Sequence, residues 1–152
     1  MEQALSVAKV FYDSYYDCFH EYMDEMKMHK LMYLVQREAL MTRKDVLFSE
    51  KFYGWKFGPV LKSVREEYHK GKPFSHVSGD VSSTAKSLVK SVLDRYGAES
   101  SWSLSRMSHG EFSWKCARKG LRPDENGDVP LDVNAMRMDA ARELAARGTV
   151  NT

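Results

Sequence analysis

The side chains of this sequence that could perform acid–base chemistry include one histidine with a carboxylate close by. His109 and Glu111 stand two positions apart, and the imidazole of histidine titrates near neutral pH. Such a pair could move protons on a substrate that is held within hydrogen-bonding reach. The alternative is structural, with His109 forming a hydrogen bond at the end of a short helix. We favour the structural interpretation, because the sequence shows no motif that would place a substrate beside the pair.

No other catalytic or metal-binding motif is present in the sequence. The histidines form no HExxH pattern, and the chain has no GxSxG, P-loop or GxGxxG motif. The two cysteines, Cys18 and Cys116, lie far apart and make no metal-binding or redox motif. We therefore predict that the chain is not an enzyme and that it uses no cofactor and no metal ion.

The acidic segment 124–128 is only superficially similar to a calcium-binding loop. An EF-hand loop has a glycine directly after its third acidic position and a bidentate glutamate at its last position. This sequence has Val129 and Ala135 at those two places. Asn126 followed by Gly127 is typical of a tight turn, so we interpret the segment as part of a surface loop.

Composition places the chain among single-domain globular proteins. It has 152 residues, of which 43% are hydrophobic and 29% are charged. The net charge of +2 favours neither a nucleic-acid partner nor an anionic membrane. No apolar run approaches the roughly 20 residues of a membrane span, and the N-terminus lacks a signal-peptide pattern. We expect a cytoplasmic protein with no membrane partner.

The segment from Phe52 to Val60 is the element around which we expect the rest of the chain to pack. Four aromatic residues in it favour extended backbone. Gly58 permits a sharp turn, and Pro59 suits the first position of a helix. We predict that Trp55 is the central packing residue, because its large ring is costly to expose to water.

Helical periodicity on both sides of this segment predicts about six helices. They cover residues 7–22, 27–41, 60–70, 85–96, 102–107 and 133–148, with a less regular helical turn at 114–117. Gly97 closes the helix at 85–96, and Asp132 caps the last helix. Segments 71–82 and 122–128 are predicted surface loops. The predicted fold is mainly α, a single compact helical domain (residues 1–148) with a small central extended or β element and a C-terminal tail (149–152).

Four short motifs, taken in order, resemble those of a known family. They are Met-His-Lys-Leu-Met-Tyr-Leu-Val-Gln at 28–36, Trp-Lys-Phe-Gly-Pro-Val at 55–60, Ser-His at 108–109 and Trp-Lys at 114–115. This order resembles the Panacea domain, first known as a phage-associated domain, and the similarity runs from about residue 7 to 119. The motif residues that carry it are Trp55, Lys56, Phe57, Gly58, Pro59, His109 and Trp114. Ser108 and Ser113 replace the threonine and proline that are common in the family.

The resemblance implies a protein-binding role. Panacea proteins act as antitoxins, each encoded beside a toxin that it neutralises by direct contact. The implied partner of this chain is therefore a cognate toxin. Some members are adaptors that deliver a toxin to a protease, and many carry an additional DNA-binding domain. The alternative functions are thus a DNA-binding or phage-associated transcriptional regulator, or a protease adaptor.

The residues that could recognise a partner are those that a shared core leaves exposed. We predict Lys62, Arg65 and Tyr68 on the third helix as candidates. The basic run that includes them is interrupted by Glu66 and Glu67, so we interpret it as a solvated helix face and do not expect nucleic-acid binding. Most methionines at helical spacing should belong to the core, with Met26 the best candidate for exposure.

Overall fold

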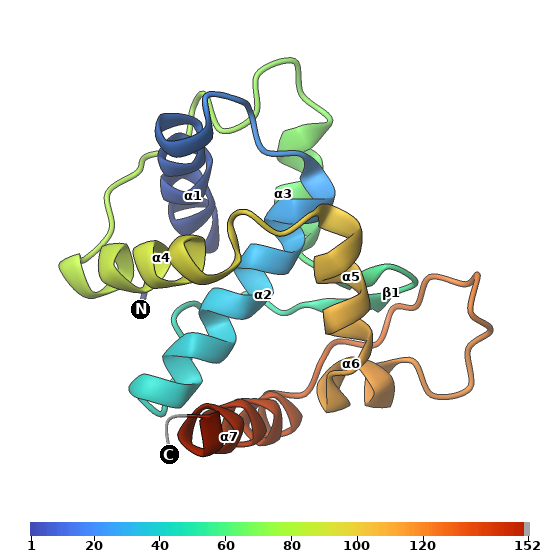
Figure 1. Cartoon of the computed structure of the whole chain (residues 1–152). Coiled ribbons are helices and arrows are strands. Elements are labelled where there is room, and N and C mark those ends of the chain that lie inside the picture. The colour runs from blue at the N-terminus through green and yellow to red at the C-terminus, as the bar shows by residue number, and fades with distance from the viewer. Residues whose placement is uncertain (151–152) are drawn as a thin grey trace.

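The computed structural model describes residues 1–150, and the mainly α fold with a small extended element is confirmed. Within that range, the chain forms helices and one two-stranded antiparallel sheet, which lies beside α5 and α6 (Figure 1). The elements are α1 (Ala4–Phe19), α2 (Glu25–Thr42), β1 (Tyr53–Trp55), β2 (Gly58–Val60), α3 (Lys62–Tyr68), α4 (Ser83–Tyr96), α5 (Ser101–His109), α6 (Phe112–Ala117) and α7 (Val133–Val150). The uncertain helical turn near Trp114 does form, as α6. Residues 151–152 of the predicted tail lie outside the described residues.

The central element of the fold is α2. It runs through the middle of the molecule, with α1 and α4 on one side, α5, α6 and the sheet on the other, and α7 across one end (Figure 1). Every residue from Lys27 to Met41 is buried. The Asp24 side chain caps the helix by accepting a hydrogen bond from the Lys27 N–H at 2.8 Å. The helix is therefore packed on all sides.

The central aromatic segment forms a β-hairpin, and the prediction that Pro59 starts a helix is wrong. β1 pairs with β2 so that Tyr53 lies opposite Val60 and Gly54 lies opposite Pro59. Because Gly58–Val60 is engaged in this pairing, the helix cannot begin before Lys62. Proline has no N–H to donate, which a two-stranded sheet tolerates because each strand has a free edge.

The prediction that Trp55 is the central packing residue is also wrong. Trp55 is only half-buried, whereas Phe52 is 1% exposed. The Phe52 ring lies 5.9 Å from the ring of Phe48 and 5.8 Å from that of Tyr33, between centroids. Successive side chains of an extended segment point to opposite sides, so Phe52 faces the core and Trp55 cannot share its position.

Several predicted ends of helices agree with the structure, and others differ. Gly97 is the residue that follows α4, and Asp132 caps α7 by accepting a hydrogen bond from the Ala135 N–H at 3.1 Å. α1 ends at Phe19, three residues earlier than predicted, because His20 adopts a left-handed conformation with φ of 60°. Tyr22 is consequently outside the helix and exposed.

The loop 71–82, predicted to lie on the surface, contains two residues of the core, Phe74 and Val81. Phe74 is fully buried and packs edge-on against Tyr68, with 5.6 Å between ring centroids. Its N–H donates to the carboxylate of Glu67 at 2.7 Å. Most of the other residues of the loop are small or polar and exposed, so the composition of the loop does not reveal that Phe74 is buried.

A buried polar network attaches α7 to α2 and α6. The hydroxyl of Tyr33 lies 2.8 Å from a Glu111 oxygen and 3.0 Å from an Asp139 oxygen. Asp139, on α7, also accepts the N–H groups of Phe112 and Ser113 at the start of α6. These bonds compensate for the burial of a carboxylate, which would otherwise be costly.

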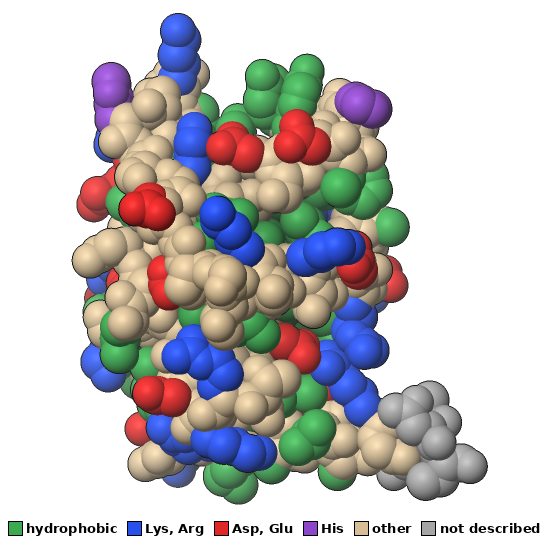
Figure 2. Space-filling view, turned by 90° about the vertical axis from the view of Figure 1, so that its left-hand side faces the viewer, with side chains coloured by type: hydrophobic (Ala, Val, Ile, Leu, Met, Phe, Trp, Pro, Cys, Tyr) green, Lys and Arg blue, Asp and Glu red, His purple; other side chains and the backbone are tan. Residues whose placement is uncertain are grey.

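The surface carries charges of both signs. On the face that Figure 2 shows, Lys and Arg side chains are interspersed with Asp and Glu, and hydrophobic side chains gather at the top, where α1 ends. Exposed aromatic residues near that end are Tyr16, Phe19 and Tyr22. In the described part of the chain, none of the helices combines the length and apolar character that crossing a membrane requires.

Candidate functional site

The tip of the β-hairpin is held in a conformation that depends on one glycine. Lys56 and Phe57 form the two-residue connection between the strands. Gly58 follows with φ of 123°, a value that residues with a Cβ atom rarely adopt. The Lys56 N–H donates to the side-chain oxygen of Asn126 at 3.0 Å. The tip is thereby fixed both to its own strands and to the loop 122–128.

Trp55, Trp114 and His109 form a connected group behind the hairpin. The indole N–H of Trp114 donates to the backbone oxygen of Trp55 at 2.8 Å. The His109 ring stacks on the Trp114 ring, with 4.3 Å between centroids and 14° between planes. Trp114 is half-buried, like Trp55. These motif residues therefore join α5 and α6 to the hairpin.

His109 and Glu111 do not form an acid–base pair in the structure. The carboxylate of Glu111 accepts hydrogen bonds from Arg37 at 2.7 Å and from Tyr33 at 2.8 Å, whereas the His109 ring lies against Trp114. Burial lowers the pKa of His109 below its usual value, and the nearby positive charge of Lys30 lowers it further. His109 is thus neutral near pH 7 and has a packing role here.

The three predicted partner-binding residues differ in their availability. Lys62 is exposed, and its ammonium lies 4.1 Å from the centre of the Tyr53 ring. The guanidinium of Arg65 lies over the Trp55 ring at 5.0 Å and 3.4 Å from Glu25. Tyr68 is partly buried, and its hydroxyl donates to the backbone oxygen of Met23 at 2.8 Å. Lys62 and Arg65 remain candidates, whereas Tyr68 offers a partner less of its surface.

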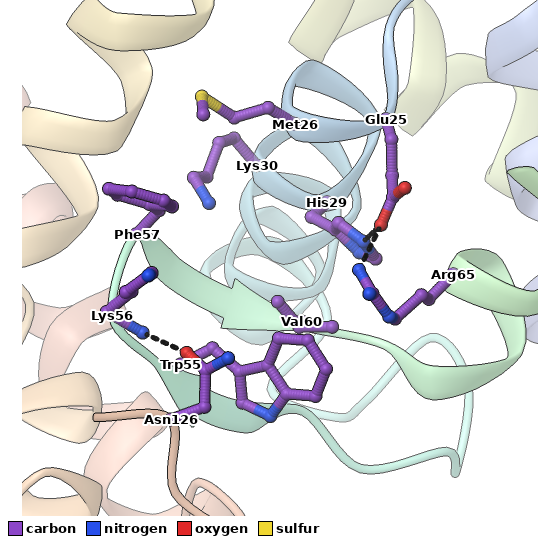
Figure 3. A pocket seen from close by; sticks show the side chains of 10 residues that line it. All are labelled: Glu25, Met26, His29, Lys30, Trp55, Lys56, Phe57, Val60, Arg65 and Asn126. Atoms are coloured by element: carbon purple, nitrogen blue, oxygen red, sulfur yellow. Dashed lines mark hydrogen bonds and ion pairs between the residues drawn. The ribbon is translucent and has the colours of Figure 1, made fainter. Parts of the chain in front are cut away.

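The hairpin, α2 and α3 enclose a pocket of about 420 Å³ (Figure 3). Glu25, His29 and Lys30 reach it from α2, and Trp55, Lys56 and Phe57 from the hairpin. Met26 also lines the pocket and is half-buried, while most other methionines of the first two helices are in the core, in agreement with the sequence. Its volume is in the range of small-molecule sites.

The polar groups on one side of the pocket bind each other. His29 bonds to Glu25 through Nε2 at 3.0 Å and accepts the Leu61 N–H through Nδ1 at 3.2 Å. Burial lowers the pKa of His29, so the ring is neutral near pH 7. The bond from His29 lowers the pKa of the Glu25 carboxyl, to which the positive charge of Arg65 also contributes. Glu25 is therefore an ionised carboxylate that already has its partners.

The segment 124–128 serves the hairpin in this structure. Asn126 accepts the hydrogen bond of Lys56, and a Cβ at Gly127 would lie 2.5 Å from the Leu121 side chain. Among residues 1–150, no group of three His, Cys, Asp or Glu side chains is arranged to hold a metal ion. Cys18 and Cys116 are both free and exposed.

Sequence reasoning did not identify Lys30 as a pocket residue. Lys27 and Lys30 stand one helical turn apart in α2, and both are buried. Lysine is almost never fully buried without a partner. Two lysines on faces that the apolar pattern assigns to the core are a signal that could have indicated a polar site.

Comparison with known proteins identifies the family of the chain. The family model described as "Antitoxin SocA-like, Panacea domain" matches residues 28–115. No curated protein and no solved structure shows a significant match. The matched residues run from α2 into α6, include the whole hairpin and pocket framework except Glu25, Met26 and Asn126, and make up more than half of the chain. The chain therefore belongs to the Panacea domain family of SocA-like antitoxins.

Proposed function

We propose that this chain is an antitoxin that neutralises the toxin encoded by a neighbouring gene through direct protein–protein binding. The observation that supports the proposal is the match of residues 28–115 to a family described as antitoxins. Neutralisation by covering an active site, or by holding an inactive shape, needs a well-packed interface and no catalytic residue. The hairpin motif fits such a role, because its residues position one another and build a rigid framework.

The surface beside the pocket has the character of a protein-binding site. Phe57 and Trp102 are 42% and 58% exposed, and their rings meet edge to face with 5.4 Å between centroids. Exposed aromatic residues that are held rigidly are typical anchors of protein interfaces. Arg65 lines the same pocket as Phe57. We define this surface, formed by Phe57, Arg65 and Trp102, as the hairpin-tip surface and assign toxin recognition to it.

Co-expression with the product of the neighbouring gene tests the proposal. That product should arrest growth when it is expressed alone, and the arrest should be relieved by this chain. The two proteins should also copurify as a stable complex. A neighbour that is harmless alone, or whose toxicity persists beside the folded chain, would show that the antitoxin assignment is wrong.

A pair of matched variants tests the assignment of the surface. Trp102→Glu should abolish both neutralisation and copurification, because it places a charge in the centre of an apolar contact. Met138→Glu is the control, because Met138 on α7 has the same 58% exposure. Equal effects of the two variants would exclude the hairpin-tip surface as the recognition site.

Two further measurements separate the antitoxin proposal from the two alternative functions. An adaptor would lower the amount of the toxin in a protease-dependent manner, and the complex alone would leave the toxin active. A DNA-binding regulator would bind its own promoter with an affinity that falls steeply as salt is raised. We expect neither result for this chain.

A further inference from the structure

The pocket beside the hairpin contains a buried lysine that lacks a partner. Lys30 is 2% exposed, and within residues 1–150 its ammonium takes part in no hydrogen bond and no ion pair. Figure 3 shows its amino group pointing from α2 into the space between Phe57 and His29. The Lys30 Nζ is not among the side-chain nitrogens of the described residues that are fully buried without a partner, so the ammonium keeps contact with the solvent of the pocket and is open to an acceptor that enters it.

Lys27, one helical turn earlier, shows how this protein ordinarily accommodates a buried ammonium. It is 7% exposed, and its Nζ donates to the Tyr15 hydroxyl at 3.2 Å and to the Gly97 backbone oxygen at 3.0 Å. Lys30 has the same depth in the same helix without such acceptors. What distinguishes the two is that Lys30 lines the pocket.

The charges around the pocket leave a cationic excess. Glu25 is the one acidic side chain among the ten that line it, and its carboxylate is already bound by His29 at 3.0 Å and Arg65 at 3.4 Å. Lys56 also lines the pocket, and its ammonium lies 5.2 Å from the centre of the Phe57 ring. Lys30 and Lys56 thus line the pocket, and neither forms an ion pair with a carboxylate among the described residues.

We propose that this pocket is a binding site for an oxyanion, a carboxylate or a phosphate group, whose charge is met by the ammonium of Lys30. The rings of Trp55 and Phe57 and the side chain of Val60 provide apolar walls, which suit an anionic group carried on an apolar or aromatic body. In such a low-dielectric site a charge-assisted hydrogen bond is stronger than it is in water.

The protonation of Lys30 is consistent with this role. Burial lowers its pKa to about 8, against the opposing effect of Asp24 and Glu25. The side chain therefore carries its charge at pH 7. A bound anion favours the ammonium form, so its arrival should raise the pKa of Lys30 again.

The anionic group could be a free small molecule or an acidic side chain of the toxin, and the two sources share the same chemistry. The first arm of the test needs no toxin, so it stands even if the antitoxin proposal fails. The full chain, with its lysines labelled for NMR, is titrated with acetate and separately with inorganic phosphate, against sodium chloride of equal ionic strength. We expect a saturable shift of the Lys30 side-chain signal and a rise in its pKa of about one unit or more.

Variants locate the response at Lys30. Lys30→Met should abolish the saturable binding. We expect this variant to fold, because the substitution replaces a buried ammonium that has no hydrogen-bond partner among the described residues with an apolar side chain of similar length. Lys86→Met, at an exposed lysine of α4, should leave the binding unchanged. An anion-dependent response that persists in Lys30→Met would place the binding elsewhere and overturn the proposal.

The second arm identifies the source of the anion. If the toxin supplies a carboxylate, the Lys30 signal should shift in the complex, acetate and phosphate should no longer perturb it, and Lys30→Met should weaken the complex at least tenfold. If the source is a free anion, acetate or phosphate should still bind in the presence of the toxin. No response of Lys30 to either probe, and none in the complex, would refute the site.

Discussion

Gly58 and Lys30 occupy adjoining space so closely that a methyl group on Gly58 would lie 2.7 Å from the Lys30 Nζ. The Ser108 hydroxyl would be nearer still, at 2.5 Å. The hairpin, α2 and α5 therefore come together at Gly58, where a side chain would have to displace the ends of Lys30 and Ser108.

Gly58→Ala should therefore destabilise the fold. The left-handed φ of 123° alone should cost about 1–3 kcal/mol in a residue with a Cβ, and displacement of Lys30 and Ser108 adds to it. Gly71→Ala is the control, because nothing lies within 4 Å of its would-be Cβ. Chemical denaturation measures both variants. Equal midpoints for the two would show that the hairpin tip adapts to a side chain.

Phe52→Ala should destabilise the protein more than Trp55→Ala. Phe52 is 1% exposed, and its ring packs against those of Tyr33 and Phe48. Removal of a buried phenylalanine side chain costs about 3–5 kcal/mol. The Trp55 ring is half-buried beneath Arg65 and loses less contact. Thermal unfolding of the two variants gives the order. A larger loss of stability for Trp55→Ala than for Phe52→Ala would show that Trp55 is the central packing residue after all.

Tyr33→Phe should weaken the attachment of α7. The hydroxyl lies between the carboxylates of Glu111 and Asp139, and loss of a partner of a buried polar group costs about 1–3 kcal/mol. Tyr53→Phe makes the same chemical change where the structure gives the hydroxyl no hydrogen bond among the described residues, so it should have little effect. Amide exchange in α7 should accelerate in the first variant only.

Lys30 should make the stability of the protein rise with pH in alkaline solution. Its pKa is about 8 in the folded state, against the ordinary value of 10.5 for a lysine in an unfolded chain. Between these values the unfolded chain holds the proton and the folded chain does not, so unfolding becomes less favourable as pH increases. The difference of 2.5 units corresponds to about 3 kcal/mol.

The measurement compares the wild type with Lys30→Met from pH 7 to 11. The variant lacks this contribution, so the difference in unfolding free energy between the two proteins isolates it from the other groups that titrate there. Asp24, Glu25, His29, Lys56 and His109 surround the lysine and are present in both proteins. A difference that does not change with pH would show that Lys30 keeps an ordinary pKa in the fold.

Local features of the fold could be predicted from the sequence, because they depend on a few neighbouring residues. The cap at Asp132 follows from the hydrogen-bonding capacity of its side chain, and α4 ends where Gly97 stands, although Gly97 keeps a right-handed conformation with φ of −59°. The hairpin was predicted as an extended segment, but the strand at Pro59 was not, because its pairing with Gly54 decides the conformation. Phe74 was missed because its loop is otherwise small and polar.

The candidate site was predicted only in part, because burial of charge is a tertiary property. The hairpin residues Trp55 to Pro59 were identified by their motif, and Arg65 by its place on α3. Lys30 was not, since a helical pattern does not show that α3 and the hairpin close over that face of α2. No local signal distinguishes Lys27, which finds acceptors, from Lys30, which does not.

The placement of α7 has a consequence for where this protein can be cut. The family match covers residues 28–115, yet α1 and α7 flank that range and both pack on α2. A fragment trimmed to 28–115 would expose two sides of α2 and would remove Asp139, a hydrogen-bond partner of the buried Tyr33 hydroxyl. We expect the shortest fragment that folds on its own, for example in a fusion protein, to extend from α1 through α7.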